Sequence, residues 1–145
     1  MTKQELAKRA VASKGWRWMP GMQCIWPNGN EWRAGQVTAA TDDAGCPIGG
    51  NYPCNGWGDE YPDRTTGLPD IDDPATLGCL MALVREAWGD GEALGIAAHA
   101  MPQIDRDGLV VKWHVWIDKN FMDSRVVGCG ATEAEALVAA LDAAP

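Results

Sequence analysis

The stretch LVVKWHVWI (residues 109–117) decides the fold of the C-terminal half, because every second residue in it is apolar. A strand with this pattern presents one continuous apolar face to a core. That face comprises Leu109, Val111, Trp113, Val115 and Ile117. If Asp105-Arg106-Asp107-Gly108 forms the preceding turn, the strand before it pairs with Ala100 opposite Trp113, Ala98 opposite Val115 and Ile96 opposite Ile117. We therefore predict an antiparallel hairpin whose apolar row lies on the core side.

Helical patterns lie on both sides of this hairpin. Asp73-Pro74 is typical of a helix start, since Asp caps unpaired N–H groups and Pro suits the first helical position. Thr132 and Glu135 form a capping box that starts a last helix. The two helices have these apolar positions: Leu77, Leu80, Met81, Val84 and Trp88 in the first, and Ala134, Leu137, Val138 and Leu141 in the second. With a further strand around Val126 and Val127, residues 74–145 form an α-β-β-β-α unit. The predicted class is α+β, an antiparallel sheet of three or more strands with flanking helices.

The N-terminal half divides into two parts. Residues 1–40 are predicted to hold a helix, opened by the Thr2/Glu5 capping box, and a Trp-rich hairpin that turns at Asn28-Gly29. That turn sets Ile25 opposite Trp32 and Trp26 opposite Glu31. Residues 41–73 are rich in Gly, Pro and Asp and have no period, so we expect an irregular insertion. The whole chain is expected to form one compact domain.

Composition limits the class of protein. The apolar fraction of 46% is ordinary for a globular chain, and no apolar run has the length of a spanning helix. The N-terminus lacks the apolar stretch of a signal peptide, which favours a cytosolic protein. Five Cys without paired spacing favour reduced thiols, although Cys46 and Cys54 could meet across a loop if oxidised. The formal charge of −8 lies within residues 70–145, which hold 13 acidic and 5 basic side chains.

The predicted register brings both histidines of the chain together. His99 is expected directly opposite His114, with Lys112, Trp116 and Met101 on the same face, away from the core. Two His can bind a metal with a third ligand, or titrate as a coupled pair near neutral pH. No third ligand is apparent, so we favour a face that lies against another layer, a partner copy or solvent. We assign no metal site and no cofactor, and regard this face as a candidate ligand or partner surface.

The N-terminal third combines basic and aromatic residues, a pattern that can bind single-stranded nucleic acid through phosphate contacts and base stacking. The candidate residues are Arg17, Trp16, Trp18, Trp26 and Trp32. The alternative is a solvated helix face followed by a Trp-rich core hairpin. We favour this alternative because the chain is acidic as a whole.

Motifs for catalysis are absent from the sequence, so no catalytic residue is assigned. The carboxylates Asp59, Glu60, Asp63, Asp70, Asp72 and Asp73 do not have calcium-loop spacing, and the last three suit a helix N-terminus. Cys129 precedes a helix N-terminus, but no His lies nearby in sequence to activate it.

Two families resemble parts of the chain. The helix–strand–strand–strand–helix order of residues 74–143 is similar to the double-stranded-RNA-binding domain. However, the last helix opens with Thr132-Glu133-Ala134-Glu135 where that family is basic, which makes duplex RNA binding improbable. LPDIDDPATLGCLMALVREAWG (68–89), ATEAEALVAALDAA (131–144) and LAKRAVASKGWRWMPGM (6–22) resemble small phage and prophage proteins with the phage ABA-sandwich domain. That resemblance implies helices flanking a small sheet and a phage genome in a bacterial cytoplasm, and it carries no established activity.

The sequence therefore favours a phage accessory protein that acts by binding a host or phage protein rather than by catalysis. Self-association is a further expectation. Two alternatives remain: capture of a nucleotide-like ligand between copies by Trp stacking, and a metal-dependent enzyme that uses His99 and His114.

Overall fold

The computed structural model describes residues 1–28, 31–36, 67–89, 97–118 and 124–145. These residues form two compact units, of which the first comprises residues 1–11 and 17–79 and the second residues 12–16 and 80–145. The helices are α1 (Lys3–Ala12), α2 (Pro74–Trp88) and α3 (Glu133–Asp142), and α2 contributes residues to both units. The strands are β1 (Gln23–Asn28), β2 (Glu31–Gln36), β3 (Leu68–Pro69), β4 (Ala97–Ile104), β5 (Val110–Asp118) and β6 (Ser124–Gly130). The mixed α+β class predicted from the sequence is confirmed.

The first unit contains a three-stranded sheet in the order β2-β1-β3. The predicted hairpin is present, but its register is wrong by two residues, because Ile25 lies opposite Ala34 and Trp26 opposite Arg33. The strands extend to the pair Asn28 and Glu31, so the connection is residues 29–30 rather than 28–29. Both Asn-Gly and Gly-Asn tolerate the positive φ angles of a two-residue turn, and residue preference alone does not choose between them.

Two features of the first unit hold its elements together. The Thr2/Glu5 capping box forms as predicted, since Thr2 N donates to Glu5 Oε2 (2.7 Å) and Glu5 N to Thr2 Oγ1 (3.2 Å). Asp73 caps α2 by accepting from Thr76 N at 2.8 Å. The fully buried Thr76 in turn accepts a hydrogen bond from Gln23 N at 2.9 Å, which ties the start of α2 to β1.

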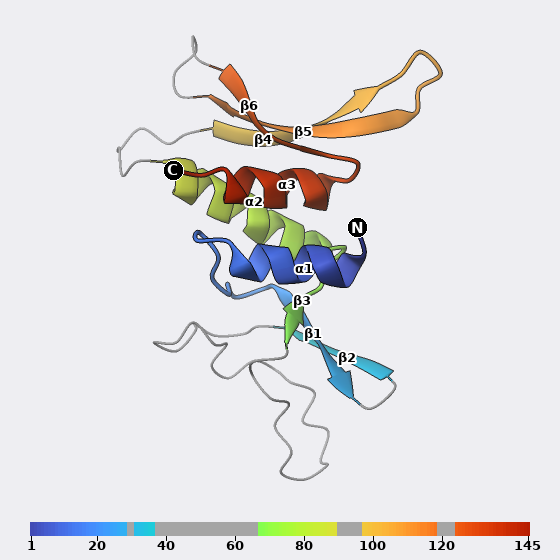
Figure 1. Ribbon diagram of the computed structural model, residues 1–145, viewed down its shortest axis with the longest axis vertical. Coiled ribbons are helices and arrows are strands. Elements are labelled where there is room, and N and C mark those ends of the chain that lie inside the picture. The colour runs from blue at the N-terminus through green and yellow to red at the C-terminus, as the bar shows by residue number, and fades with distance from the viewer. Residues whose placement is uncertain (29–30, 37–66, 90–96, 119–123) are drawn as a thin grey trace. The chain divides into compact units, whose positions relative to one another are not determined.

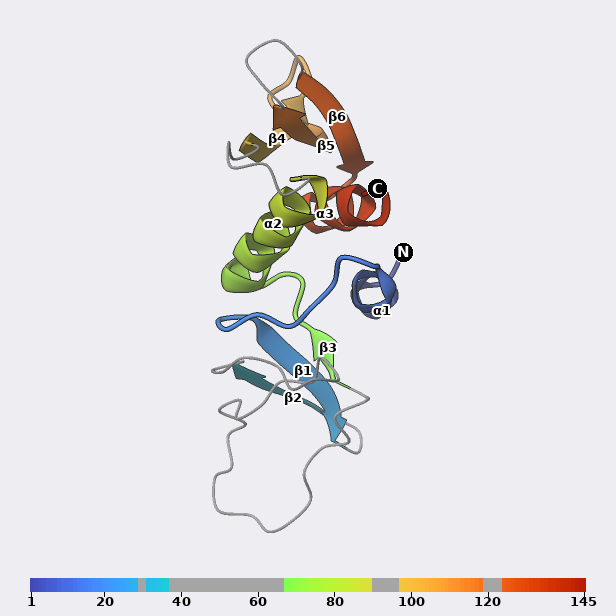
Figure 2. The ribbon, with the colours of Figure 1, turned by 90° about the vertical axis from the view of Figure 1, so that its left-hand side faces the viewer.

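The second unit is a layer of helix against a layer of sheet. The sheet has the order β4-β5-β6, and α3 packs chiefly on β6 and also contacts β5 and β4. Figures 1 and 2 show α3 and the C-terminal part of α2 on the same side of this sheet. The Trp88 indole of α2 donates to Ala140 O of α3 at 2.9 Å, and the Arg125 guanidinium of β6 lies 5.0 Å from the Trp88 ring centroid. The predicted element order is therefore confirmed.

Close approach between α3 and β6 explains two glycines. A Cβ added at Gly128 would lie 2.6 Å from Ala140 N, and one added at Gly130 would lie 2.7 Å from Ala136 N. Real side chains do not approach backbone atoms so closely, so these positions require glycine. The Gly-Cys-Gly stretch (128–130) is thus a packing feature.

The apolar stripes fit the core of this unit closely. Thr132 is the N-cap of α3, accepting from Glu135 N at 3.2 Å, and all four apolar positions predicted for this helix are buried. In α2, Leu80, Val84 and Trp88 are buried as predicted, while Leu77 and Met81 are only half-buried. Leu83 replaces them in the buried stripe.

Candidate functional site

The β4–β5 hairpin differs from the predicted register by two residues along most of its length. Ala98 lies opposite Ile117 and Ala100 opposite Val115, where Val115 and Trp113 respectively were predicted. The prediction assumed a two-residue turn. Gly108 instead adopts a φ of 81°, and Asp105 N donates to Leu109 O at 2.9 Å, so the turn contains one residue more.

A second irregularity adds the other residue. Gln103 pairs with Lys112 and Ile104 with Val110, which leaves Val111 as an extra residue on β5. The extra residue in the turn and the extra residue Val111 together shift the register by two residues. Because side chains alternate with a period of two, each residue of β5 from Lys112 onward keeps its predicted face. Only the identity of its cross-strand neighbour changes.

In the observed register, the two histidines do not lie opposite each other. His99 lies opposite Trp116, and His114 lies opposite Met101, so the predicted direct His–His pair is wrong. They remain on one face of the sheet as diagonal neighbours, a relation in which Cβ atoms are about 7 Å apart. Within the described parts of the chain, no three His, Cys, Asp or Glu side chains gather closely enough to hold a metal.

We call the sheet face that carries these residues the outer face. By strand register it comprises Met101, Trp116 and Val126 together with His99, Gln103, Lys112, His114, Asp118, Ser124 and Cys129. Helix α3 covers the opposite face, where Val115 and Ile117 are fully buried. Within the second unit, α3 and the C-terminal part of α2 lie on the opposite side of the sheet (Figure 2), so no described element of that unit covers the outer face. Met101 is 51% exposed there and Val126 43%, while Trp116 and His114 are half-buried.

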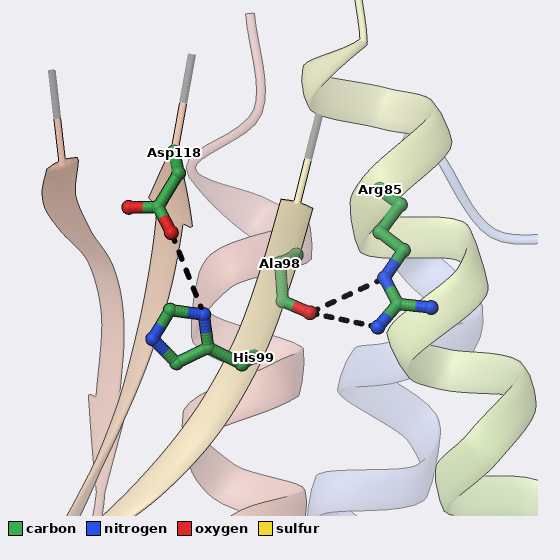
Figure 3. A network of polar contacts seen from close by, with 4 residues as sticks. All are labelled: Arg85, Ala98, His99 and Asp118. Atoms are coloured by element: carbon green, nitrogen blue, oxygen red, sulfur yellow. Dashed lines mark hydrogen bonds and ion pairs between the residues drawn. The ribbon is translucent and has the colours of Figure 1, made fainter. Parts of the chain in front are cut away.

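Polar groups border this apolar centre. His99 Nδ1 lies 3.8 Å from Asp118 Oδ2 (Figure 3), a separation that gives an ion pair only when the imidazole is protonated. Lys112 is exposed. Cys129 is also exposed and lies opposite His114 in the register of β5 and β6. The outer face thus combines an apolar and aromatic centre with a titratable border.

The free edge of β4 is blocked at two positions. The Arg85 side chain donates to Ala98 O at 3.2 Å from Nε and 2.8 Å from Nη2 (Figure 3), so this carbonyl points away from β5. Backbone groups alternate in direction along a strand, which places the backbone of Ala100, Pro102 and Ile104 at the same edge. Pro102 has no N–H to donate. An extended peptide cannot complete a ladder along this edge.

The far end of the hairpin is a surface that the sequence did not reveal. Strand β6 pairs with β5 only from Trp113 onward, so the hairpin beyond that residue is two-stranded in the described structure and runs past α3 (Figure 1). We call this part, from Ile104 to Lys112, the hairpin tip. Its large apolar side chains are exposed: Ile104 57%, Leu109 66%, Val110 50% and Val111 51%. The expectation that Leu109 and Val111 belong to the core face is wrong, because the helix layer ends before the strands do.

The structure describes the side chains of three of the basic, Trp-rich candidates, namely Trp16, Arg17 and Trp18. Trp18 is buried, as the core interpretation predicts, so its ring is not open to a nucleic-acid base. Trp16 is half-buried and Arg17 exposed. The side chains of Trp26 and Trp32 lie outside the described residues, as do Cys46, Cys54, Asp59, Glu60 and Asp63.

The other carboxylates have structural partners. Asp70 accepts from Asp72 N at 3.2 Å, Asp72 pairs with Lys3, and Asp73 caps α2. The Asp72 carboxylate accounts for most of the raised pKa of Lys3, with which it forms a hydrogen bond. These contacts support the helix-terminus interpretation of the acidic run.

Comparison with known proteins found no matching family model, no matching curated protein and no matching solved structure. Among the described helices, none combines the length and apolar character needed to cross a membrane.

Proposed function

We propose that this chain is a phage or prophage accessory protein that works in the bacterial cytoplasm by binding a host or phage protein. The observation that carries the proposal is the outer face of the β4-β5-β6 sheet. Met101 and Val126 are exposed at its centre beside Trp116, and His99 and Lys112 lie at its border. An apolar centre with an aromatic residue and a polar border is the usual anatomy of a protein interface.

The two sheet faces have different compositions, and the difference supports this assignment. The covered face uses small and β-branched residues that fit beneath α3, such as Ala98 and Val115. The outer face carries Trp116, Met101 and Val126 among polar residues that include Lys112 and Asp118, so it offers large contact areas and hydrogen-bonding groups together. A face required only for solubility would not need these large apolar side chains among its polar ones.

The test is a quantitative pull-down from the host lysate with variants that change only the outer face. Wild-type protein should enrich a discrete partner, and Met101→Asp or Val126→Asp should lose it, because a carboxylate would have to be desolvated in the interface. Val11→Asp is the matched control, since Val11 is an exposed apolar residue of α1 and the charge change is equal. This control should retain the partner. If wild type enriches nothing above background, or if all three variants behave alike, the proposal fails.

A further inference from the structure

The hairpin tip carries a balanced set of charges in a strongly acidic chain. Asp105 and Asp107 are opposed by Arg106 and Lys112, so the tip is neutral, whereas the chain carries −8. Asp105 Oδ1 is engaged inside the turn, where it accepts from Asp107 N and Leu109 N, each at 2.9 Å. Among the described residues, no ion pair joins Arg106 or Lys112 to a carboxylate. The basic groups of the tip are therefore available to an external partner.

A partner cannot bind the hairpin tip by pairing an extended strand with the backbone of β4 or β5. The outward edge of β4 lacks a donor at Pro102. On β5, the extra residue Val111 distorts the strand, and Lys112 places a charge beside it. Bulges, prolines and lysines are the features with which proteins prevent strands from adding to an edge. A partner must instead pack on the side chains of Ile104, Leu109 and Val110.

We infer that the hairpin tip is a self-association surface that binds the tip of a second copy of this chain. A two-fold contact between identical patches requires each patch to complement itself. The tip meets this condition, because its apolar centre is flanked by charges of both signs, and Arg106 of one copy can face Asp107 of the other. Two copies meeting at any strongly acidic surface would repel, and the neutral tip avoids this cost. The tip and the outer face share Lys112 but none of the residues substituted in either test, so this inference can fail while the proposed function holds, and the reverse.

The interface is expected to be weak. Four exposed aliphatic side chains give a smaller contact than the roughly 800 Å² per partner of a standard stable complex, so we expect dissociation in the micromolar range. Sedimentation velocity of the full chain over a concentration series should show a monomer–dimer equilibrium. Val110→Asp should raise the dissociation constant by at least about 30-fold, as for a residue at the centre of an interface. Val11→Asp should leave the constant unchanged.

Charge reversal gives a test that does not depend on apolar side chains. Arg106→Asp makes the tip acidic and Asp107→Arg makes it basic, so each variant alone should be monomeric. A mixture of the two should form a heterodimer, because the tips then carry opposite charges. Three results would each overturn the inference: a wild-type chain that stays monomeric, a Val110→Asp variant that is folded and still dimeric, or charge variants that fail to associate when mixed. Circular dichroism of each variant checks that the fold is intact.

Discussion

The β4–β5 hairpin has a covered end and an exposed end. At the covered, inner end Val115 and Ile117 lie beneath α3 and are fully buried. At the outer end, which is the hairpin tip, Leu109 and Val111 are more than half exposed. The four residues belong to one alternating stretch and are of similar size and polarity. The two pairs differ because α3 covers only part of the hairpin, which continues beyond this helix (Figure 1). The same sequence pattern therefore makes a core at one end and a surface at the other.

The largest contrast should come from truncating one apolar residue at each end. Ile117→Ala removes a fully buried side chain and should lower the free energy of unfolding by about 2–5 kcal/mol, since the transfer and cavity costs add. Val111→Ala should cost less than about 1 kcal/mol, because its side chain is already in water. Urea unfolding at low protein concentration measures both. Equal losses in the free energy of unfolding would show that Val111 is covered within a single copy, contrary to its exposure in the structure.

The next contrast concerns the glycines that let α3 approach the inner end. Gly128→Ala forces a methyl group against the backbone of α3 and should destabilise the protein by about 1–3 kcal/mol. Gly78→Ala is the control, because Gly78 lies within α2 with nothing within 4 Å of an added Cβ. That change should stabilise the protein by about 0.5–1 kcal/mol through the higher helix propensity of Ala. Thermal unfolding of the two variants should therefore shift in opposite directions.

Sequence patterns predicted the elements of the second unit well, because each is encoded locally. Thr132 and Glu135 cap α3, Asp73 caps α2, and Asp105 to Gly108 turn the hairpin, all through contacts within a few residues. The exact register was not predictable in this way. It depends on one extra residue in the turn and one in β5, and the φ of Gly108 and the bulge at Val111 are selected by how the strands pack.

The sequence also did not predict which part of the sheet α3 covers. Alternation assigned His99 and Trp116 to the face away from the core, and the structure agrees. It could not show that α3 ends short of Leu109, because helix length and strand length are encoded in separate segments. The short β3 strand was also missed, since the two residues Leu68 and Pro69 are too few to show a period.

A smaller effect is expected at the turn of the outer end. Gly108→Ala places a Cβ on a residue with a φ of 81° and should cost about 1 kcal/mol. Gly108→Asn should cost less, because Asn adopts this conformation more readily than Ala. Chemical unfolding compares the two variants. An Ala variant as stable as wild type would mean that the tip rearranges freely, and the fixed presentation of Leu109 and Val110 would then be in doubt.

The smallest effect extends the comparison of covered and exposed groups to two thiols. Burial raises the pKa of Cys24 to about 12, whereas Cys129 is exposed on the outer face. An unfolded thiol ionises near pH 8.5. Above that pH the unfolded chain releases a proton that folded Cys24 retains, so its contribution to stability is complete below pH 8.5 and is lost as pH rises toward 12. Between pH 8 and 9 the loss should be about 0.7 kcal/mol.

The variants Cys24→Ala and Cys129→Ala isolate this contribution from the other groups that titrate in alkali. Stability is compared with wild type at each pH, so that the Lys and Tyr contributions cancel. The difference between Cys24→Ala and wild type should shrink steadily as pH rises, with Cys129→Ala measured alongside as the substitution of an exposed thiol. Parallel curves for Cys24→Ala and wild type would mean that water reaches the buried thiol. The first unit would then lack the dry core that its buried Met22 and Leu68 indicate.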